Sequence, residues 1–141
     1  MMNHIKVYTK QAAGVEYPNS FANSVHFALC SEDGEMEELN QGCGILYALA
    51  KIRPDDTLME RGIKNPVIFE QDGQYGILAE YVDAGGDPLK PDILLLWNTA
   101  DFVDFSQQRE VSRVDYAPIY QKAGTSLPLS LTLCEKIRAR W

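Results

Sequence analysis

Aromatic, amide and imidazole side chains come close together in the first part of the sequence, at Tyr17, Asn23 and His26. An aromatic ring offers an apolar face, and amide and imidazole groups hydrogen-bond to hydroxyl groups. This combination suits a hydroxyl-rich ligand, so carbohydrate is the expected partner. The alternative is that His26 is a satisfied core histidine and that Tyr17 is a packed loop residue.

Two carboxylates follow a hydroxyl residue by two positions, in Ser31-x-Asp33 and in Thr99-x-Asp101. Hydroxyl and carboxylate groups in such positions bond to the backbone of a turn. The pattern therefore predicts two similar turns rather than two catalytic acids.

The three cysteines, Cys30, Cys43 and Cys134, are far apart, and His4 and His26 are not spaced as zinc ligands. An odd number of cysteines in apolar stretches is typical of buried free thiols in a reducing compartment. The sequence predicts no metal and no cofactor.

The composition limits the classes of partner. The chain has 141 residues, with 45% hydrophobic and 23% charged, which fits one globular domain. A net charge of −7 disfavours binding to nucleic acid. The longest apolar run, Ile93 to Trp97, is far shorter than the ~20 residues of a membrane helix. The first ten residues have no secretion signal, so a cytoplasmic location and no membrane contact are expected.

Short apolar runs between turn residues predict an all-β chain. The run 44–53 also suits a helix, but its neighbours and length favour a strand. The segment 92–98 lacks alternation and should be buried on both faces. The strands are expected at 4–10, 24–30, 36–39, 44–53, 57–61, 66–70, 75–82, 92–98 and 103–111.

The end of the chain differs from the rest. Thr132 and Glu135 match a capping box ahead of an apolar stripe at Leu133 and Ile137. This predicts one short C-terminal helix. We accordingly divide the chain into a β module at 1–126 and a helix at 127–141, which packs on the module or leads to a linker.

An internal repeat suggests how the strands associate. Residues 25–33 and 93–101 align without gaps as an apolar strand followed by an Asp-containing turn. Four strands are expected within 66–111, and about 45 residues is the size of one propeller blade. The expected fold is an incomplete β-propeller-like array of antiparallel four-stranded blades with a short C-terminal helix.

This order of motifs resembles the blades of glycoside hydrolase family 43 over residues 1–111. The residues that carry the resemblance are Pro66, Ile68, Asp72, Gly73, Tyr75, Ile93 to Trp97, Thr99, Asp101 and Phe105. The resemblance implies a five-bladed propeller and an inverting mechanism that uses two carboxylic acids.

The chain departs from that family in two respects. Asn65 stands where the family has a catalytic Asp, and 141 residues supply about three blades at about 45 residues each. No catalytic residue is therefore expected, and Asn65 joins the predicted binding residues of a non-catalytic, carbohydrate-binding module. One alternative is a small active glycosidase that uses Asp115 with Asp33 or Glu16. Another is a protein-interaction or oligomerisation module.

An incomplete array leaves apolar surface to cover. The strand at 92–98 is too apolar to face water, and one short helix cannot shield a sheet face and two edges. We therefore expect a homodimer, or contact with the rest of a longer parent protein.

Overall fold

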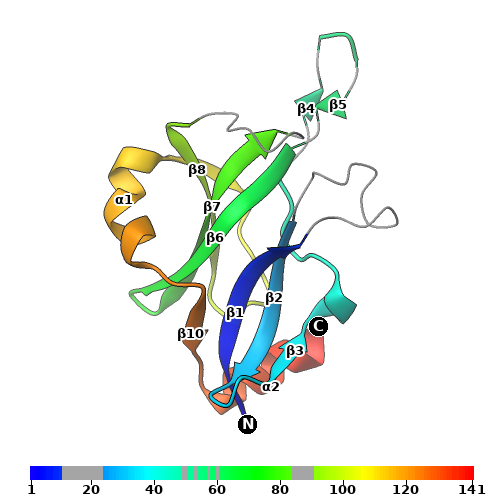
Figure 1. Ribbon diagram of the computed structural model, residues 1–141, viewed down its shortest axis with the longest axis vertical. Helices are drawn as coiled ribbons and strands as arrows, with labels where there is room; N and C mark the ends of the chain where they lie inside the picture. The colour runs from blue at the N-terminus through cyan, green and yellow to red at the C-terminus, as the bar shows by residue number, and fades with distance from the viewer. Residues whose placement is uncertain (11–23, 49–50, 53, 57, 60, 84–90) are drawn as a thin grey trace.

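The structure is a computed structural model that describes residues 1–10, 24–48, 51–52, 54–56, 58–59, 61–83 and 91–141. Two antiparallel four-stranded sheets form most of this part of the chain, and a helix packs on each of them (Figure 1). The elements are β1 (Met2–Lys10), β2 (Ser24–Ser31), β3 (Met36–Glu38), a 3-10 turn (Asn40–Gly42), β4 (Lys51–Ile52), β5 (Leu58–Met59), β6 (Arg61–Gln71), β7 (Gln74–Asp83), β8 (Ile93–Thr99), β9 (Arg109–Ser112), α1 (Arg113–Lys122), β10 (Ser126–Pro128) and α2 (Leu131–Arg140).

The first sheet has the strand order β10-β1-β2-β3. β1 and β2 form its long central pair, which ends with Lys10 opposite Ser24. The strand on the outer side of β1 comes from the far end of the chain, because β10 places Leu127 opposite Ile5.

The predicted strand at 44–53 is wrong for most of its length. One bridge joins Leu46 to Val25 of β2, and only β4 pairs further, with β5 in a separate two-stranded sheet. The side chains of Asn40 and Tyr47 both donate hydrogen bonds to the Gly44 carbonyl. The Gly44 carbonyl is therefore occupied by hydrogen bonds within a local turn and is not available for pairing with a neighbouring strand.

The second sheet runs β6-β7-β8-β9 in chain order. Its first hairpin turns at Asp72 and Gly73, whose φ angles of 54° and 78° are both left-handed. Asp-Gly at such positions favours a two-residue turn that matches strand twist. The predicted hairpin and the four strands within 66–111 are confirmed, although β6 begins earlier, at Arg61.

The main core lies between the two sheets, and a smaller core lies on the far face of the second sheet under α1. Leu95 and Trp97 of β8 belong to the main core, whereas Leu94 and Leu96 belong to the smaller one. These four side chains are at most 3% exposed. The prediction that this strand is buried on both faces is confirmed.

The helix α1 was not expected, so the prediction of a single helix is wrong. It begins after Ser112, whose Oγ accepts a hydrogen bond from the Asp115 backbone N–H. Pro118 inside the helix removes a backbone donor and is typical of a helix break. Packing compensates, because Tyr116, Ile119 and other α1 side chains cover the smaller core.

The C-terminal helix is confirmed, but its expected cap is not. Ser130, not Thr132, accepts the capping hydrogen bond, from the Leu133 backbone N–H. Cys134 and Ile137 are buried against the main core. The helix therefore packs on the β module.

Two smaller predictions also need correction. The strand at 103–111 is reduced to β9, because residues up to Asp104 form a turn and Phe105 makes a single bridge to Thr99. Cys43 is exposed, whereas Cys134 is buried. The described residues are thus mostly β, in two open four-stranded sheets with two helices. None of the helices described is long and apolar enough to span a membrane.

Candidate functional site

His26, a predicted binding residue, lies on β2 and is 1% exposed. Its ring stacks on Tyr8 at a centroid distance of 5.5 Å, and its Nε2 lies 3.1 Å from the Ser24 Oγ. The Tyr8 hydroxyl donates to Glu38, and burial, followed by this hydrogen bond, raises the pKa of Tyr8. These contacts favour the alternative reading of His26 as a packed sheet residue.

Asn65 lies on β6, at a shift in the pairing with β7, and its side chain is exposed. Its φ angle is 51°, and its backbone oxygen accepts a 2.7 Å hydrogen bond from the Tyr120 hydroxyl of α1. Burial raises the pKa of Tyr120 to about 12, so this donor keeps its proton at neutral pH. His26 and Asn65 stand on different sheets, and Tyr17 and Asn23 lie outside the described residues.

The acids of the glycosidase alternative are not brought together either. Asp115 lies exposed in the first turn of α1, beside the second sheet. Asp33 lies exposed in the turn between β2 and β3 of the first sheet. Glu16 lies outside the described residues.

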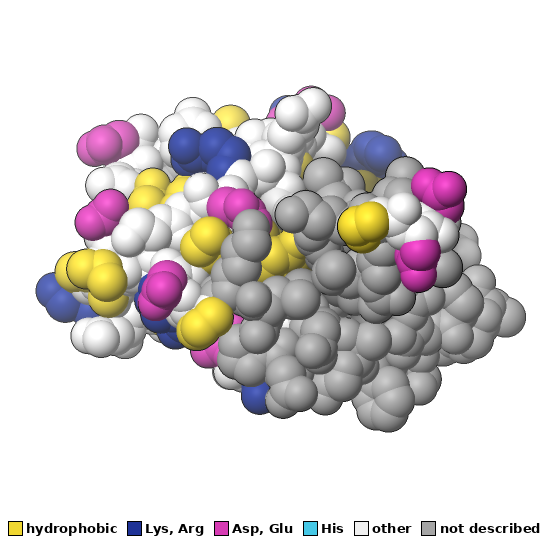
Figure 2. Space-filling view, turned by 90° about the horizontal axis from the view of Figure 1, so that it is seen from above, with side chains coloured by type: hydrophobic (Ala, Val, Ile, Leu, Met, Phe, Trp, Pro, Cys, Tyr) yellow, Lys and Arg dark blue, Asp and Glu magenta, His cyan; other side chains and the backbone are white. Residues whose placement is uncertain are grey.

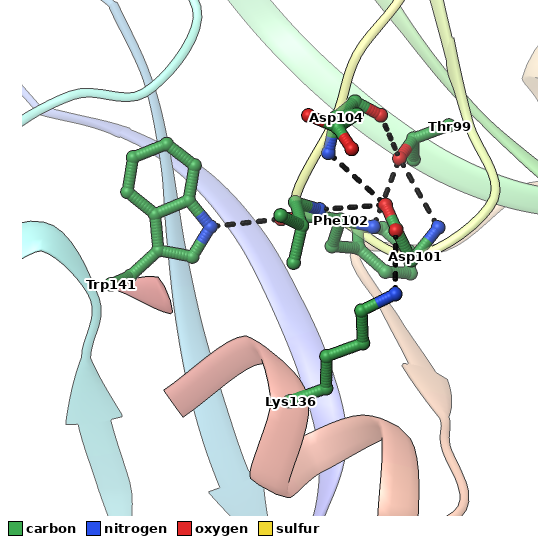
Figure 3. A network of polar contacts seen from close by, with 7 residues as sticks. Thr99, Asp101, Phe102, Asp104, Lys136 and Trp141 are labelled. Atoms are coloured by element: carbon green, nitrogen blue, oxygen red, sulfur yellow. Dashed lines mark hydrogen bonds and ion pairs between the residues drawn. The ribbon is translucent and has the colours of Figure 1, made fainter. Parts of the chain in front are cut away.

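The second predicted turn is a closed network (Figure 3). The Thr99 Oγ1 accepts from the backbone N–H groups of Asp101 and Phe102 and donates to the Asp104 carbonyl. The Asp101 carboxylate accepts from Asp104 and Val103 backbone N–H groups.

From α2, the Lys136 ammonium reaches the same carboxylate at 2.9 Å, and the Trp141 Nε1 donates to the Phe102 carbonyl. The turn-forming role of Thr99 and Asp101 is confirmed. In the first copy of the repeat, Ser31 likewise accepts a hydrogen bond, from the Glu35 backbone N–H.

Two neighbouring cavities lie beside α1 and the second sheet, and Phe69 and Gln71 of β6 line both of them. The smaller cavity, of about 190 Å³, has among its lining residues Phe69, Gln71, Gln74, Asn98, Arg109 and Tyr116. The larger cavity, of about 490 Å³, extends to the end of α1, with Glu70, Pro118, Lys122 and Leu127 among its lining residues. We call them the paired cavities.

Gly76 determines where the Phe69 side chain lies between the two cavities. β6 and β7 place Phe69 opposite Gly76, and β8 places Asn98 on the other side of Gly76. A Cβ added at Gly76 would lie 2.3 Å from Phe69 Cζ, so the far end of the ring occupies the space above this glycine. The half-buried Phe69 ring therefore leans across the sheet and presents an aromatic surface to both cavities.

The polar side chains around the smaller cavity are free to bind. Among the described residues, none of them forms a side-chain hydrogen bond or an ion pair, and Asn98 Oδ1 is a buried oxygen without a partner. A buried polar atom without a partner costs about 1–3 kcal/mol, so Asn98 Oδ1 is expected to bind a ligand. Gln71, Gln74 and Arg109 are exposed and can reach a ligand from solvent. The six polar side chains are those of Gln71, Gln74, Tyr75, Asn98, Arg109 and Tyr116.

The sequence did not reveal this site, because its residues come from five elements, β6, β7, β8, β9 and α1. Gln71 and Gln74 flank the predicted Asp-Gly turn, which was the one local signal. Arg109 reaches the site through its pairing opposite Leu96, and Tyr116 reaches it on the unexpected helix α1. Only the strand register shows that these side chains share one face.

Charge is distributed without a large acidic patch on the side shown in Figure 2. In the described part of this view, acidic side chains are scattered and alternate with basic ones. No group of three or more His, Cys, Asp and Glu side chains that could hold a metal ion occurs among the described residues. Since neither a charged patch in this view nor a metal cluster among the described residues marks another site, we take the paired cavities as the candidate site.

Comparisons of the chain with protein-family models, with curated proteins and with solved structures found no match.

Proposed function

We propose that this protein binds carbohydrate in the paired cavities and does not hydrolyse a glycosidic bond by itself. The observation that carries the proposal is that six polar side chains line the smaller cavity with Phe69 and, among the described residues, form no side-chain hydrogen bond or ion pair. A sugar hydroxyl both donates and accepts, as do the amides of Gln71, Gln74 and Asn98. The apolar face of a sugar ring matches an aromatic surface such as that of Phe69.

The size of the cavities supports a ligand with more than one sugar unit. Drug-sized ligands occupy pockets of roughly 300–1,000 Å³. The smaller cavity, at about 190 Å³, is below this range and suits one sugar ring. The larger cavity, at about 490 Å³, lies within the range and offers space for further sugar units. An oligosaccharide that crosses Phe69 would use both.

The absence of hydrolysis follows from the acids near the site. Glycoside hydrolysis by the usual mechanisms requires two carboxyl groups on either side of the bond. Among the residues that line the paired cavities, Glu70 is the one acid. Asn65, which stands where the resembled family has an Asp, carries an amide that cannot act as a base.

We further propose that the chain is a propeller-like module of a protein similar to glycoside hydrolase family 43. The support is the four-stranded meander β6-β7-β8-β9, which has the strand order of a propeller blade. The motif residues from Pro66 to Phe105 fall on this sheet and its turns.

Titration calorimetry with arabino- and xylo-oligosaccharides tests the binding. We expect saturable binding that Phe69→Ala weakens about tenfold, equivalent to ~1.4 kcal/mol, because the aromatic surface is lost. Gln74→Ala provides a second variant that leaves the fold unchanged, since Gln74 is exposed. Val114→Ala is the control, because it removes an exposed apolar side chain of α1 that lines neither cavity.

Two results would contradict the proposal. Absence of binding to every oligosaccharide at millimolar concentration would reject the carbohydrate site. Steady hydrolysis of aryl arabinosides or xylosides by the unmodified chain would reject the non-catalytic assignment.

A further inference from the structure

The charge of the smaller cavity differs from that of the chain. The chain carries 20 acidic and 13 basic side chains. Yet among the described residues Arg109 is the one charged residue that lines the smaller cavity, and no described Asp or Glu lines it. In the larger cavity, by contrast, Glu70 is balanced by Lys122.

Arg109 is also unpaired. Among the described residues its guanidinium forms no ion pair and no hydrogen bond, whereas Arg113 and Arg138 each contact a glutamate. Arg109 lies on β9 opposite Leu96, so its position on the sheet is fixed by strand pairing. A cation with this fixed position and no internal partner is available to an anionic ligand.

The neighbours of Arg109 restrict the kind of anion. A guanidinium binds the two oxygens of a carboxylate through parallel hydrogen bonds. Gln71, Gln74 and Asn98 provide neutral donors and acceptors around it, which suit the ring hydroxyls of a sugar. One cation beside several amides fits a ligand with one carboxylate among many hydroxyls.

We infer that the smaller cavity selects a sugar acid, a uronic acid residue whose carboxylate binds Arg109, and that the larger cavity takes a neutral part of the same glycan. This inference rests on the proposed carbohydrate-binding function and specifies its ligand. Asn98, whose Oδ1 has no partner among the described residues, lines the same cavity and would orient the same sugar ring.

The test compares two probes that differ at one carbon: methyl β-glucuronide and methyl β-glucoside. Calorimetry at low salt should show the glucuronide binding about tenfold more tightly, because a charge-assisted pair replaces a neutral hydrogen bond. Added salt should reduce this advantage, since the guanidinium of Arg109 is exposed.

Variants of Arg109 test whether this residue causes the preference for the glucuronide. Arg109→Gln should abolish the preference for the glucuronide, so that both probes bind with equal affinity, because the charge that distinguishes them is removed. Arg109→Lys should restore part of the preference, because an ammonium keeps the charge but lacks the planar fork. Lys64→Gln is the matched control: it removes one positive charge from an exposed β6 side chain that lines neither cavity.

The outcomes separate this inference from the proposed function. Equal binding of both probes would overturn the inference while the carbohydrate site stands. A glucuronide preference that survives Arg109→Gln would overturn the role of Arg109. Absence of binding of either probe, together with absence of oligosaccharide binding, would overturn both.

Discussion

Asp101 illustrates how a carboxylate can serve a turn rather than a reaction. The backbone N–H of Asp104, the ammonium of Lys136 and the backbone N–H of Val103, in decreasing order of effect, lower its pKa to about 2. All three groups donate hydrogen bonds to the charged form. The depressed pKa therefore reports structural stabilisation of the turn after β8.

The first prediction concerns pH. Because the pKa of Asp101 in the folded chain lies below its usual value of 3.8, the charged form stabilises the native state. Asp101→Asn should lower the free energy of unfolding by about 1–2 kcal/mol at pH 7. The difference from the unmodified chain should disappear as the pH falls from about 4 through 2, which urea unfolding at several pH values measures.

Asp104→Asn is the control for this experiment. Its side chain is exposed in the same turn, and the hydrogen bonds of Asp104 shown in Figure 3 use its backbone. An equal loss of stability in both variants, or a difference that persists at pH 2, would contradict the assigned role of Asp101.

At the residue scale, the sequence predicted local roles better than shared sites. The Thr99 and Asp101 turn was predictable, because the backbone groups that these side chains bind lie within five residues, whereas the contacts of Lys136 and Trp141 were not. Gln71, Asn98 and Arg109 are far apart in the sequence, and only the register of β6 to β9 brings them to one cavity. Tyr17 and Asn23 stay predictions.

At the element scale, the Asp-Gly hairpin and the apolar strand β8 were predictable from turn chemistry and hydrophobicity. The helix α1 was not, because its sequence contains Pro118 and has little helical periodicity. Its stability depends on tertiary packing of Tyr116, Ile119 and Tyr120 over the smaller core, which a local pattern does not contain.

The second prediction belongs to the element scale and tests the contact between β6 and β7. Gly76→Ala places a methyl group 2.3 Å from Phe69 Cζ, so the ring must move. We expect a loss of about 1–3 kcal/mol in the free energy of unfolding, together with weaker binding of oligosaccharides. Thermal and urea unfolding measure the first effect, and calorimetry measures the second.

Gly124→Ala is the matched control for stability, because a Cβ added there meets no other atom within 4 Å. If Gly76→Ala were as stable as this control and bound ligand as well as the unmodified chain, the proposed position of the Phe69 ring would be wrong.

At the scale of the whole molecule, the surface that was expected to need a second copy is already covered. The first sheet covers one face of β8, and α1 covers the other. Of the four outer strands, β3 and β9 are short and carry charged residues, which discourages pairing with another chain, β10 is also short, and β6 is long. The homodimer stays a prediction, but the reason given for it does not hold.

Sedimentation equilibrium at micromolar concentration measures the oligomeric state. The covered faces of β8 favour a single species of 15.8 kDa across the concentration range. A species of twice this mass would show that another surface, such as the paired cavities, joins two copies.

The pairing of β10 with β1 has a consequence for the order of folding. β1 is synthesised before its outer neighbour β10, which places Leu127 opposite Ile5 and follows all the other strands described. Until then one edge of β1 has no partner, and closing so long a loop costs entropy before the contact forms. Such non-local strand pairing slows folding. The first sheet is therefore completed only after β10 has been made, whereas the second sheet, whose strands are neighbours in the sequence, can form before it.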